Sequence, residues 1–289
     1  MSRMGDVLAG FHAAWEFDTD SVLIRFERGI RTPRLLQALG ERRIPYEALA
    51  AVEQAPGKRG TVVLRAVPRP GADPLMDVAN GQLKEVCDPY RLVLPAERDA
   101  LAEYYADEIR ASLGPCADQP AERHLVAAPA PPLSFKAYDG KASFDGASVA
   151  FRWFWTGASS AKWKAGDQRF AVGELAGVEW RSPEFAGGHL RLVPRDGDSR
   201  QPGPADQDPA AVVFGMGYGL VHESLPFAAA VLAAVRAGAR GLPAARVPAP
   251  RPDPGGIADR IRHLGALHDA GLLTDDEFST KKAELLAEL

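Results

Sequence analysis

The chain of 289 residues contains only two cysteines, Cys87 and Cys116, and neither has a second pair nearby. Disulfide scaffolds and zinc sites need several cysteines, or cysteines and histidines at short spacings, so we expect neither here. Two free thiols are typical of a protein that is kept in a reducing compartment. The cysteine content therefore predicts a cytoplasmic protein.

Long apolar runs are also missing. The alanine-rich run 227–235 has nine residues, which is about half of the roughly 18 that a membrane span requires. The first residues show neither a charged segment followed by an apolar run nor a twin-arginine pair, so we expect no export signal. Both features favour a soluble protein.

No part of the chain carries a strong excess of positive charge. The formal net charge is −4 for the whole chain, −2 for residues 1–113 and 0 for residues 133–237. Proteins that bind nucleic acid through their overall charge are far more basic than this. Nucleic acid is therefore not an expected partner.

The residue types that catalysis uses do not fall into catalytic patterns. No G-x-S-x-G is present, and the glycine run 215–219 lacks the spacing of a dinucleotide fingerprint, so it predicts a tight hairpin turn followed by Pro226 and then a helix. No metal-ligand spacing such as H-x-H or H-E-x-x-H occurs among the histidines, which are His12, His124, His189, His222, His263 and His268. We expect no catalytic, cofactor-binding or metal-binding residues, and a protein that is not an enzyme.

The sequence does contain a long internal repeat. Residues 40–69 return as residues 166–195, with eleven identities at one fixed offset. A unit of about a hundred residues is too long for a solenoid repeat, whose period is roughly 20 to 50 residues. We therefore expect two copies of one folded domain.

Each copy is expected to consist of short strands followed by one helix. In copy one, the apolar residues at 15–26 alternate at period two, and 61–67 is rich in β-branched residues, so both segments predict strands. Weaker strand candidates follow at 75–78, 83–86 and 90–94. An amphipathic closing helix is predicted by residues four apart, which are Leu101, Tyr105, Ile109 and Leu113.

Copy two repeats this order and closes with a helix at 227–237. Its predicted strands are 142–144, 149–155, 170–180, 189–194 and 211–216. The fold class is therefore α+β, with two tandem modules in which a helix closes a β-barrel or sandwich. This order of elements resembles the pleckstrin-homology-like (PH-like) superfold.

Proline-rich segments divide the chain into domains. Residues 114–132 and 238–256 each hold five prolines and predict extended linkers, of which the second is expected to be flexible. The expected domains are therefore the modules 1–113 and 133–237 and a C-terminal helical hairpin, 257–289. The segment 197–209 is expected to be a surface loop that copy one lacks.

The C-terminal hairpin has an apolar stripe on both helices, with Gly271 ending the first helix and a capping box at 274–277 opening the second. A hairpin this short cannot bury a hydrophobic core of its own. We therefore expect it to pack against the rest of its chain or against another protein. The candidate assembly surface consists of Ile257, Ile261, Leu264, Leu267, Phe278, Leu285 and Leu289.

The tail also carries a family motif. Leu-x-x-Leu-x-x-x-Gly-x-Leu-Thr-x-x-Glu-Phe-x-x-x-Lys runs from Leu264 to Lys282, and the segment 257–286 resembles the short C-terminal (SHOCT) domain of bacterial proteins. The duplicated part, with Gly-Phe-x-x-x-Trp-x-Phe-Asp at 10–18, resembles an actinobacterial family of unknown function that places tandem copies ahead of such a tail. The resemblance implies this architecture and an assembly role for the tail, and it implies no activity.

Basic and aromatic residues gather in two segments, 25–43 and 152–164. The candidate anion or membrane surface consists of Arg25, Arg28, Arg31, Arg34, Arg42, Arg43, Arg152, Lys162, Trp163 and Lys164. The alternative interpretation is that Trp153 and Trp155 face the core while the charges keep two hairpins soluble.

Two functions remain open. The first is a non-enzymatic binding or scaffold protein whose tail assembles with a protein partner or with itself. The second is a peripheral membrane or anionic-ligand binder that uses the two basic segments.

Overall fold

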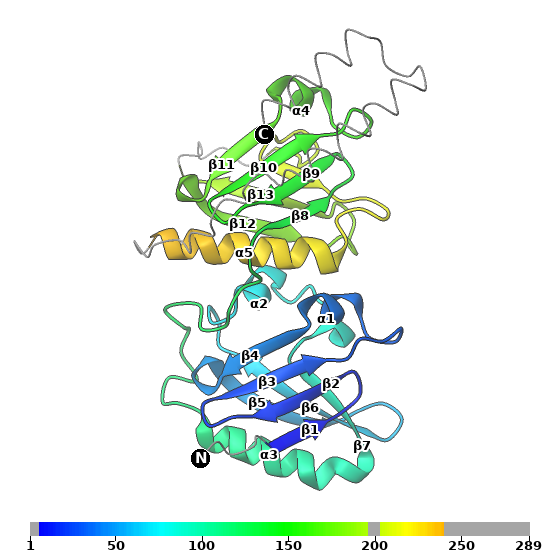
Figure 1. Cartoon of the computed structure of the whole chain (residues 1–289), viewed down its shortest axis with the longest axis vertical. Helices are drawn as coiled ribbons and strands as arrows, with labels where there is room; N and C mark the ends of the chain where they lie inside the picture. The colour runs from blue at the N-terminus through cyan, green and yellow to red at the C-terminus, as the bar shows by residue number, and fades with distance from the viewer. Residues whose placement is uncertain (1–5, 196–202, 240–289) are drawn as a thin grey trace, which may run out of the picture. The chain divides into compact units, whose positions relative to one another are not determined.

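The computed structural model describes residues 6–195 and 203–239, and in this part the two copies have the same order of strands, first short helix and closing helix (Figure 1). Copy one has in addition the helix α2, Pro74–Ala79, between its sixth and seventh strands. Each copy has a four-stranded antiparallel sheet, a three-stranded antiparallel sheet and a closing helix. The expected α+β class is confirmed. The predicted C-terminal hairpin and its linker lie outside the described residues.

Copy one contains the sheets β1-β2-β3-β4 and β5-β6-β7. The strands are β1 Asp6–Ala9, β2 Ala13–Phe17, β3 Ser21–Phe26, β4 Glu41–Pro45, β5 Leu49–Pro56, β6 Thr61–Pro68 and β7 Arg91–Pro95. The α-helices are α1 Arg34–Leu39, α2 Pro74–Ala79 and the closing helix α3 Asp99–Ser112.

Copy two contains the sheets β11-β10-β9-β8 and β12-β13-β14. The strands are β8 Leu133–Lys136, β9 Gly140–Phe144, β10 Ser148–Trp153, β11 Gln168–Ala171, β12 Leu175–Arg181, β13 His189–Pro194 and β14 Ala211–Val213. The helices are α4 Ser160–Ala165, at the position of α1, and the closing helix α5 Val221–Ala239.

Residues that recur in the sequence make the same contacts in both copies. Arg65 donates from Nε to Asp88 over 3.0 Å, and Arg191 donates from Nε to Asp208 over 2.9 Å. Each aspartate precedes a proline and also accepts the backbone N–H two residues later. The repeated arginine and the Asp-Pro pair thus fix the chain at the start of the last strand of each module.

Several local predictions were wrong. The segment 170–180, predicted as one strand, contains the end of β11, a 3₁₀ turn at 172–174 and most of β12. The segment 75–78 lies in α2, because Asp73 caps this helix by accepting the N–H of Leu75 and Pro74 occupies its first turn. The segment 83–86 runs into a 3₁₀ turn, 85–87, and only 90–94 contains a strand, β7. Pro226 lies inside α5 rather than ahead of it, since burial of α5 outweighs the low helix propensity of proline.

The closing helix of copy two packs against both copies. Its buried residues belong to a core cluster that also contains Leu35 of α1 and Leu75 and Val78 of α2. Across the same junction, the side chain of Gln82 donates to the carbonyl oxygen of Trp180 over 3.0 Å and accepts the N–H of Ser182 over 2.9 Å. The core of copy two therefore extends through α5 to α1 and α2 of copy one, while the other core residues of copy one form a second cluster.

Within residues 6–195 and 203–239, no helix combines the length and the apolar character that crossing a membrane would demand.

Candidate functional site

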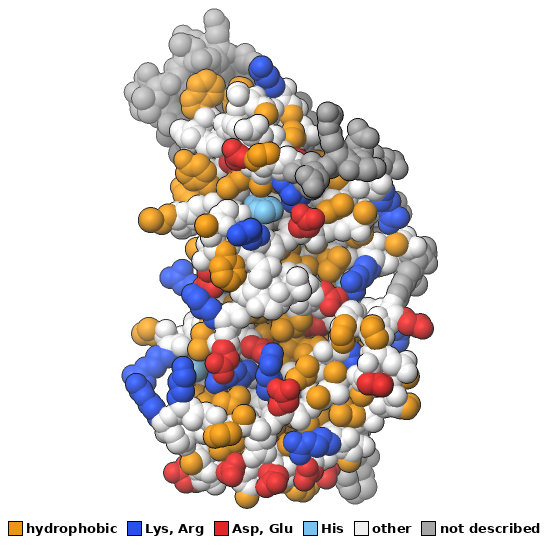
Figure 2. All heavy atoms as spheres, turned by 180° about the vertical axis from the view of Figure 1, so that it is seen from behind, with side chains coloured by type: hydrophobic (Ala, Val, Ile, Leu, Met, Phe, Trp, Pro, Cys, Tyr) orange, Lys and Arg blue, Asp and Glu red, His pale blue; other side chains and the backbone are white. Residues whose placement is uncertain are grey.

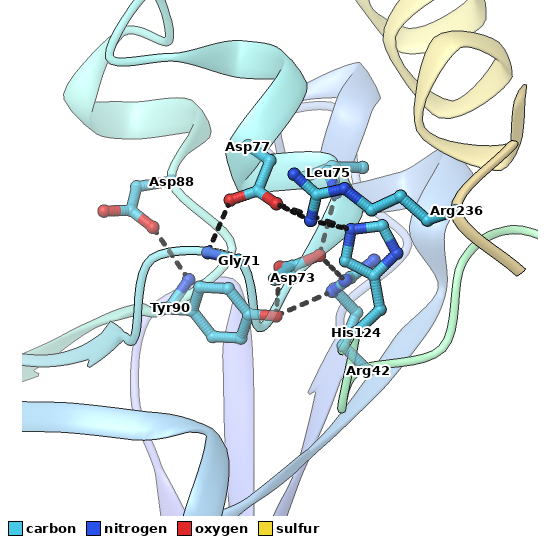
Figure 3. A network of polar contacts seen from close by, with 9 residues as sticks. All are labelled: Arg42, Gly71, Asp73, Leu75, Asp77, Asp88, Tyr90, His124 and Arg236. Atoms are coloured by element: carbon cyan, nitrogen blue, oxygen red, sulfur yellow. Dashed lines mark hydrogen bonds and ion pairs between the residues drawn. The ribbon is translucent and has the colours of Figure 1, made fainter. Parts of the chain in front are cut away.

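Two of the predicted surface cations are buried. Arg42 is 5% exposed, and its guanidinium donates to Asp73 over 2.8 Å and to the hydroxyl of Tyr90 over 3.2 Å (Figure 3). Burial lowers the pKa of Arg42, but the charges of Tyr90 and Asp73 and the hydrogen bonds to them outweigh it and raise the pKa. The same burial, with the charge of Asp73, raises the pKa of Tyr90. Arg42 is thus part of the copy-one core.

Lys162 in copy two is fully buried as well. Its Nζ donates to Asp139 over 2.5 Å and to the carbonyl oxygen of Ala211 over 2.8 Å, and it lies 5.0 Å from the ring centre of Trp153. Lys162 belongs to α4, so the segment 152–164 is a strand end, a turn and a helix rather than a hairpin. This correction removes Lys162 from any surface for an external anion.

Three further candidates have acidic partners on the surface. Arg25 lies 2.9 Å from Glu16, Arg152 lies 3.4 Å from Asp167, and Arg43 pairs with Asp18. The Arg43 pair recurs in copy two between Arg169 and Asp145 at 3.0 Å. Arg43 therefore belongs to a repeated surface contact of the fold.

The other basic candidates form a free cluster in copy one. Arg28, Arg31 and Arg34 are exposed, and none of them takes part in an ion pair among the described residues. Ile30, between them, is 106% exposed, and Phe11 on the neighbouring turn is 50% exposed. We call this set, Phe11, Arg28, Ile30, Arg31 and Arg34, the copy-one tip.

Copy two exposes a larger apolar set. Trp155 is 79% and Trp163 is 51% exposed, and their rings meet edge to face at 5.3 Å between centres. Met216 is 99% exposed beside Tyr218, which lies edge to face with Tyr138 at 6.3 Å. The copy-two tip consists of Tyr138, Trp155, Trp163, Lys164, Met216 and Tyr218. Trp153 does face the core, whereas Trp155 does not.

Two glycines shape the loops of the copy-two tip. A Cβ at Gly157 would lie 2.2 Å from the carbonyl oxygen of Tyr138, so only glycine lets the loop after β10 approach the turn before β9. Gly217 has φ +80°, and the backbones of Gly215 and Tyr218 bond to each other around it. The predicted tight turn at 215–219 is confirmed, and it projects Met216.

The two tips occupy equivalent positions in the two modules. The N–H of Phe11 donates to Val93 over 2.7 Å, and the N–H of Tyr138 donates to Val213 over 2.9 Å. In each copy, the loop that follows the third strand then bonds back to the residue after this aromatic, and a short helix, α1 or α4, follows the loop. The first turn and the loop after the third strand therefore carry exposed residues in both copies, and in copy two α4 and the turn before α5 add further ones.

The tips also share one edge of the described part. The start of α5, which directly follows the 215–219 turn, lines a hollow of about 840 Å³ together with Ala38 and Leu39 of α1, which directly follows the arginines. Along its left edge, Figure 2 shows Lys and Arg side chains projecting from the lower half and hydrophobic side chains from the upper half. This edge therefore carries cations in copy one and hydrophobic side chains in copy two.

A second polar network pins the linker and α5 to copy one (Figure 3). Asp77 of α2 accepts from Arg236 of α5 over 2.9 Å and from the N–H of Gly71 over 3.0 Å, and His124 of the linker lies 3.4 Å from it. Burial raises the pKa of Asp77, but the hydrogen bonds with His124 and Gly71 and the charge of Arg236 outweigh it and lower the pKa. Of the other histidines, His222 lies 4.0 Å from Glu223.

No group of three or more His, Cys, Asp and Glu side chains could hold a metal ion in residues 6–195 and 203–239. The seven apolar residues of the candidate assembly surface, Ile257 to Leu289, lie outside the described residues.

Comparison with known proteins gives two family matches. The profile of the domain of unknown function DUF4429 matches residues 15–110 and again residues 142–232, which confirms the tandem copies. The profile of the short C-terminal domain, SHOCT, matches residues 259–286. No curated protein matches the chain. The chain belongs to the DUF4429 family, as two tandem copies of this domain followed by a SHOCT domain.

Proposed function

We propose that this chain is a non-enzymatic binding protein that attaches to anionic membrane surfaces from one side, without spanning them. The observation that supports this most is the exposed pair of Trp155 and Trp163 beside Lys164. Tryptophan and tyrosine prefer the boundary between lipid and water, and lysine adds attraction to anionic headgroups. The copy-two tip combines all three residue types.

Leaving these side chains in water is unfavourable. Burying one large apolar side chain contributes about 1.5–3 kcal/mol, and the copy-two tip exposes four rings and Met216. A contiguous exposed set of this kind marks an interaction surface more often than chance exposure does. Since Lys162 and Asp139 neutralise each other underneath, the free charge of the tip is positive.

The arrangement of elements supports a PH-like fold. A four-stranded and a three-stranded antiparallel sheet with one closing helix, repeated in both copies, is the order expected of that superfold. Such small modules present loops at one end of a rigid scaffold, where binding residues commonly lie. The tips are loops of this kind.

Vesicle binding tests the proposal. The full chain should co-sediment with vesicles of phosphatidylcholine and phosphatidylglycerol, and a Trp155→Ser/Met216→Ser variant should bind at least about tenfold more weakly, because two apolar side chains no longer enter the interface. Phe185→Ser is the matched control, since Phe185 is 52% exposed outside the tips. Equal binding by the tip variant and the control would refute the proposal.

We also propose that the tail assembles the protein, with itself or with another protein. This rests on the SHOCT match and on the apolar stripe of residues 257–289. Light scattering should give a larger molar mass for the full chain, relative to one monomer, than for a chain that ends at Arg240. Monomeric masses for both chains across micromolar concentrations would exclude self-association.

A further inference from the structure

We infer that the two tips bind one anionic lipid surface at the same time, with the copy-one tip recognising phosphate headgroups and the copy-two tip entering the boundary with the acyl chains. This inference rests on the proposed membrane binding and adds the partner chemistry of each tip. It also assigns the surface to the pair of copies rather than to either copy alone.

The composition of the tips supports this division. The copy-one tip has three arginines around Ile30 that form no ion pair within the described residues, whereas the copy-two tip has four aromatic rings, Met216 and one lysine. Arginine presents a planar fork of donors that matches phosphate oxygens in a bidentate geometry. Aromatic side chains instead gain by leaving water at the lipid boundary.

The junction between the copies holds the tips in a fixed arrangement. The core cluster continues from copy two through α5 to Leu35 and Leu75. At its surface, Arg236 lies 2.9 Å from Asp77 and Lys84 lies 2.6 Å from Glu184. Two contacts on one rigid body bind the same surface without a further loss of rotational freedom, so their binding factors multiply.

The competing arrangement makes a different prediction. If either tip could bind alone but not together with the other, the binding constants would add, and loss of one tip would lower binding by no more than about twofold for tips of equal strength. If both tips bind at the same time, loss of one tip divides the binding constant by the whole factor that this tip contributes. Three arginines near an anionic surface correspond to about a hundredfold at low salt, at about fivefold each.

The test measures partition onto vesicles for four full-length chains. These are the wild type, Arg28→Gln/Arg31→Gln/Arg34→Gln, Trp155→Ser/Met216→Ser, and the combination of both sets. A charge-matched control carries the same Arg→Gln change at three other exposed residues. These are Arg110 on α3, Arg123 on the linker and Arg169 on β11. All the replaced side chains are exposed, and circular dichroism with thermal unfolding verifies that each chain is folded.

We expect the arginine variant to bind vesicles that contain phosphatidylglycerol at least about tenfold more weakly than the charge-matched control. We also expect its remaining binding to lose most of the salt dependence of the wild type. The inference would be overturned if the arginine variant bound these vesicles within about twofold of its control. The proposed membrane binding would still stand in that case if the Trp155→Ser/Met216→Ser variant bound them more weakly than the wild type. If the wild type bound no vesicle, both the inference and the proposed membrane binding would be overturned. If the arginines bound an acidic protein instead, that protein would replace lipid as the ligand of the copy-one tip.

Discussion

The two closing helices, α3 and α5, occupy the same place in the two copies but have different surroundings. α3 buries only one face, through Ala102, Tyr105, Ala106 and Ile109, and its other face is exposed. α5 is apolar on almost every side, because it packs against its own sheets and against α1 and α2 of copy one. A helix that is apolar all round is a buried helix. The difference shows that α3 covers copy one alone, whereas α5 lies at the junction of the two copies.

The tips differ in the same way between the copies. Equivalent loops carry arginines in copy one and aromatic residues in copy two, on a backbone that makes the same hydrogen bonds. The buried cations differ too, since Arg42 lies on β4 and Lys162 lies on α4. The repeated residues keep the fold, and the residues that diverged distinguish the two surfaces.

Phe227→Ala should have the largest effect on stability. Phe227 on α5 is 1% exposed and meets Phe135 and Phe144 edge to face at 5.0 and 6.2 Å. We expect a loss of about 3–5 kcal/mol of unfolding free energy. Urea unfolding should show one transition that shifts as a whole, because α5 belongs to both copies. Two separate transitions would contradict a shared core.

Arg42→Met should have an effect of similar size. It leaves the carboxylate of Asp73 buried without its cation, which costs about 3–5 kcal/mol. Arg25→Met is the matched control, since Arg25 is exposed and pairs with Glu16 and Glu41 at the surface, and it should cost less than about 1 kcal/mol. Urea unfolding of both variants measures the difference, and equal losses would show that Arg42 is not locked in the core.

Asp77→Asn should weaken the junction at neutral pH by about 1–2 kcal/mol, since Asp77 accepts hydrogen bonds from α5 and from copy one. The pKa of Asp77 is lowered by folding. Its contribution is therefore fully present above the unfolded carboxyl pKa and is lost as the pH falls through the folded value. The difference between wild type and variant should shrink as the pH falls below the ordinary aspartate pKa of about 3.9. A difference that persists there would disprove the charged contact.

Leu101→Ser and Tyr104→Ser should have the smallest effects. Both residues lie on the outer face of α3 and are 41% and 53% exposed. Their unfolding free energies should remain within about 0.5 kcal/mol of the wild type. Thermal unfolding measures this, and a loss above about 2 kcal/mol would mean that α3 is covered in solution as α5 is.

The sequence predicted the duplication and the closing helices well, because periodicity and repeated residues report local structure directly. It did not predict α2 as a helix, since Leu75 and Val78 suit a strand as well as a short helix. The burial of Arg42 could have been predicted, because Arg42 and Ile44 alternate at period two and so share the inner face of β4. The burial of Lys162 could not, since its partner Asp139 lies in a turn of another hairpin and only the fold brings them together. The sequence also could not separate Arg28, Arg31 and Arg34 from the basic candidates that form surface ion pairs, because those ion pairs depend on the fold.

Depth-dependent fluorescence quenching tests membrane binding by the tips most directly. Trp15, Trp153 and Trp180 are at most 8% exposed, so Trp155 and Trp163 are the tryptophans that can meet lipid. With vesicles that contain brominated acyl chains and phosphatidylglycerol, the emission should shift to shorter wavelength and be quenched, and Trp155→Ser should remove most of the change. Emission that stays the same when the full chain is mixed with these vesicles at low salt would contradict the account.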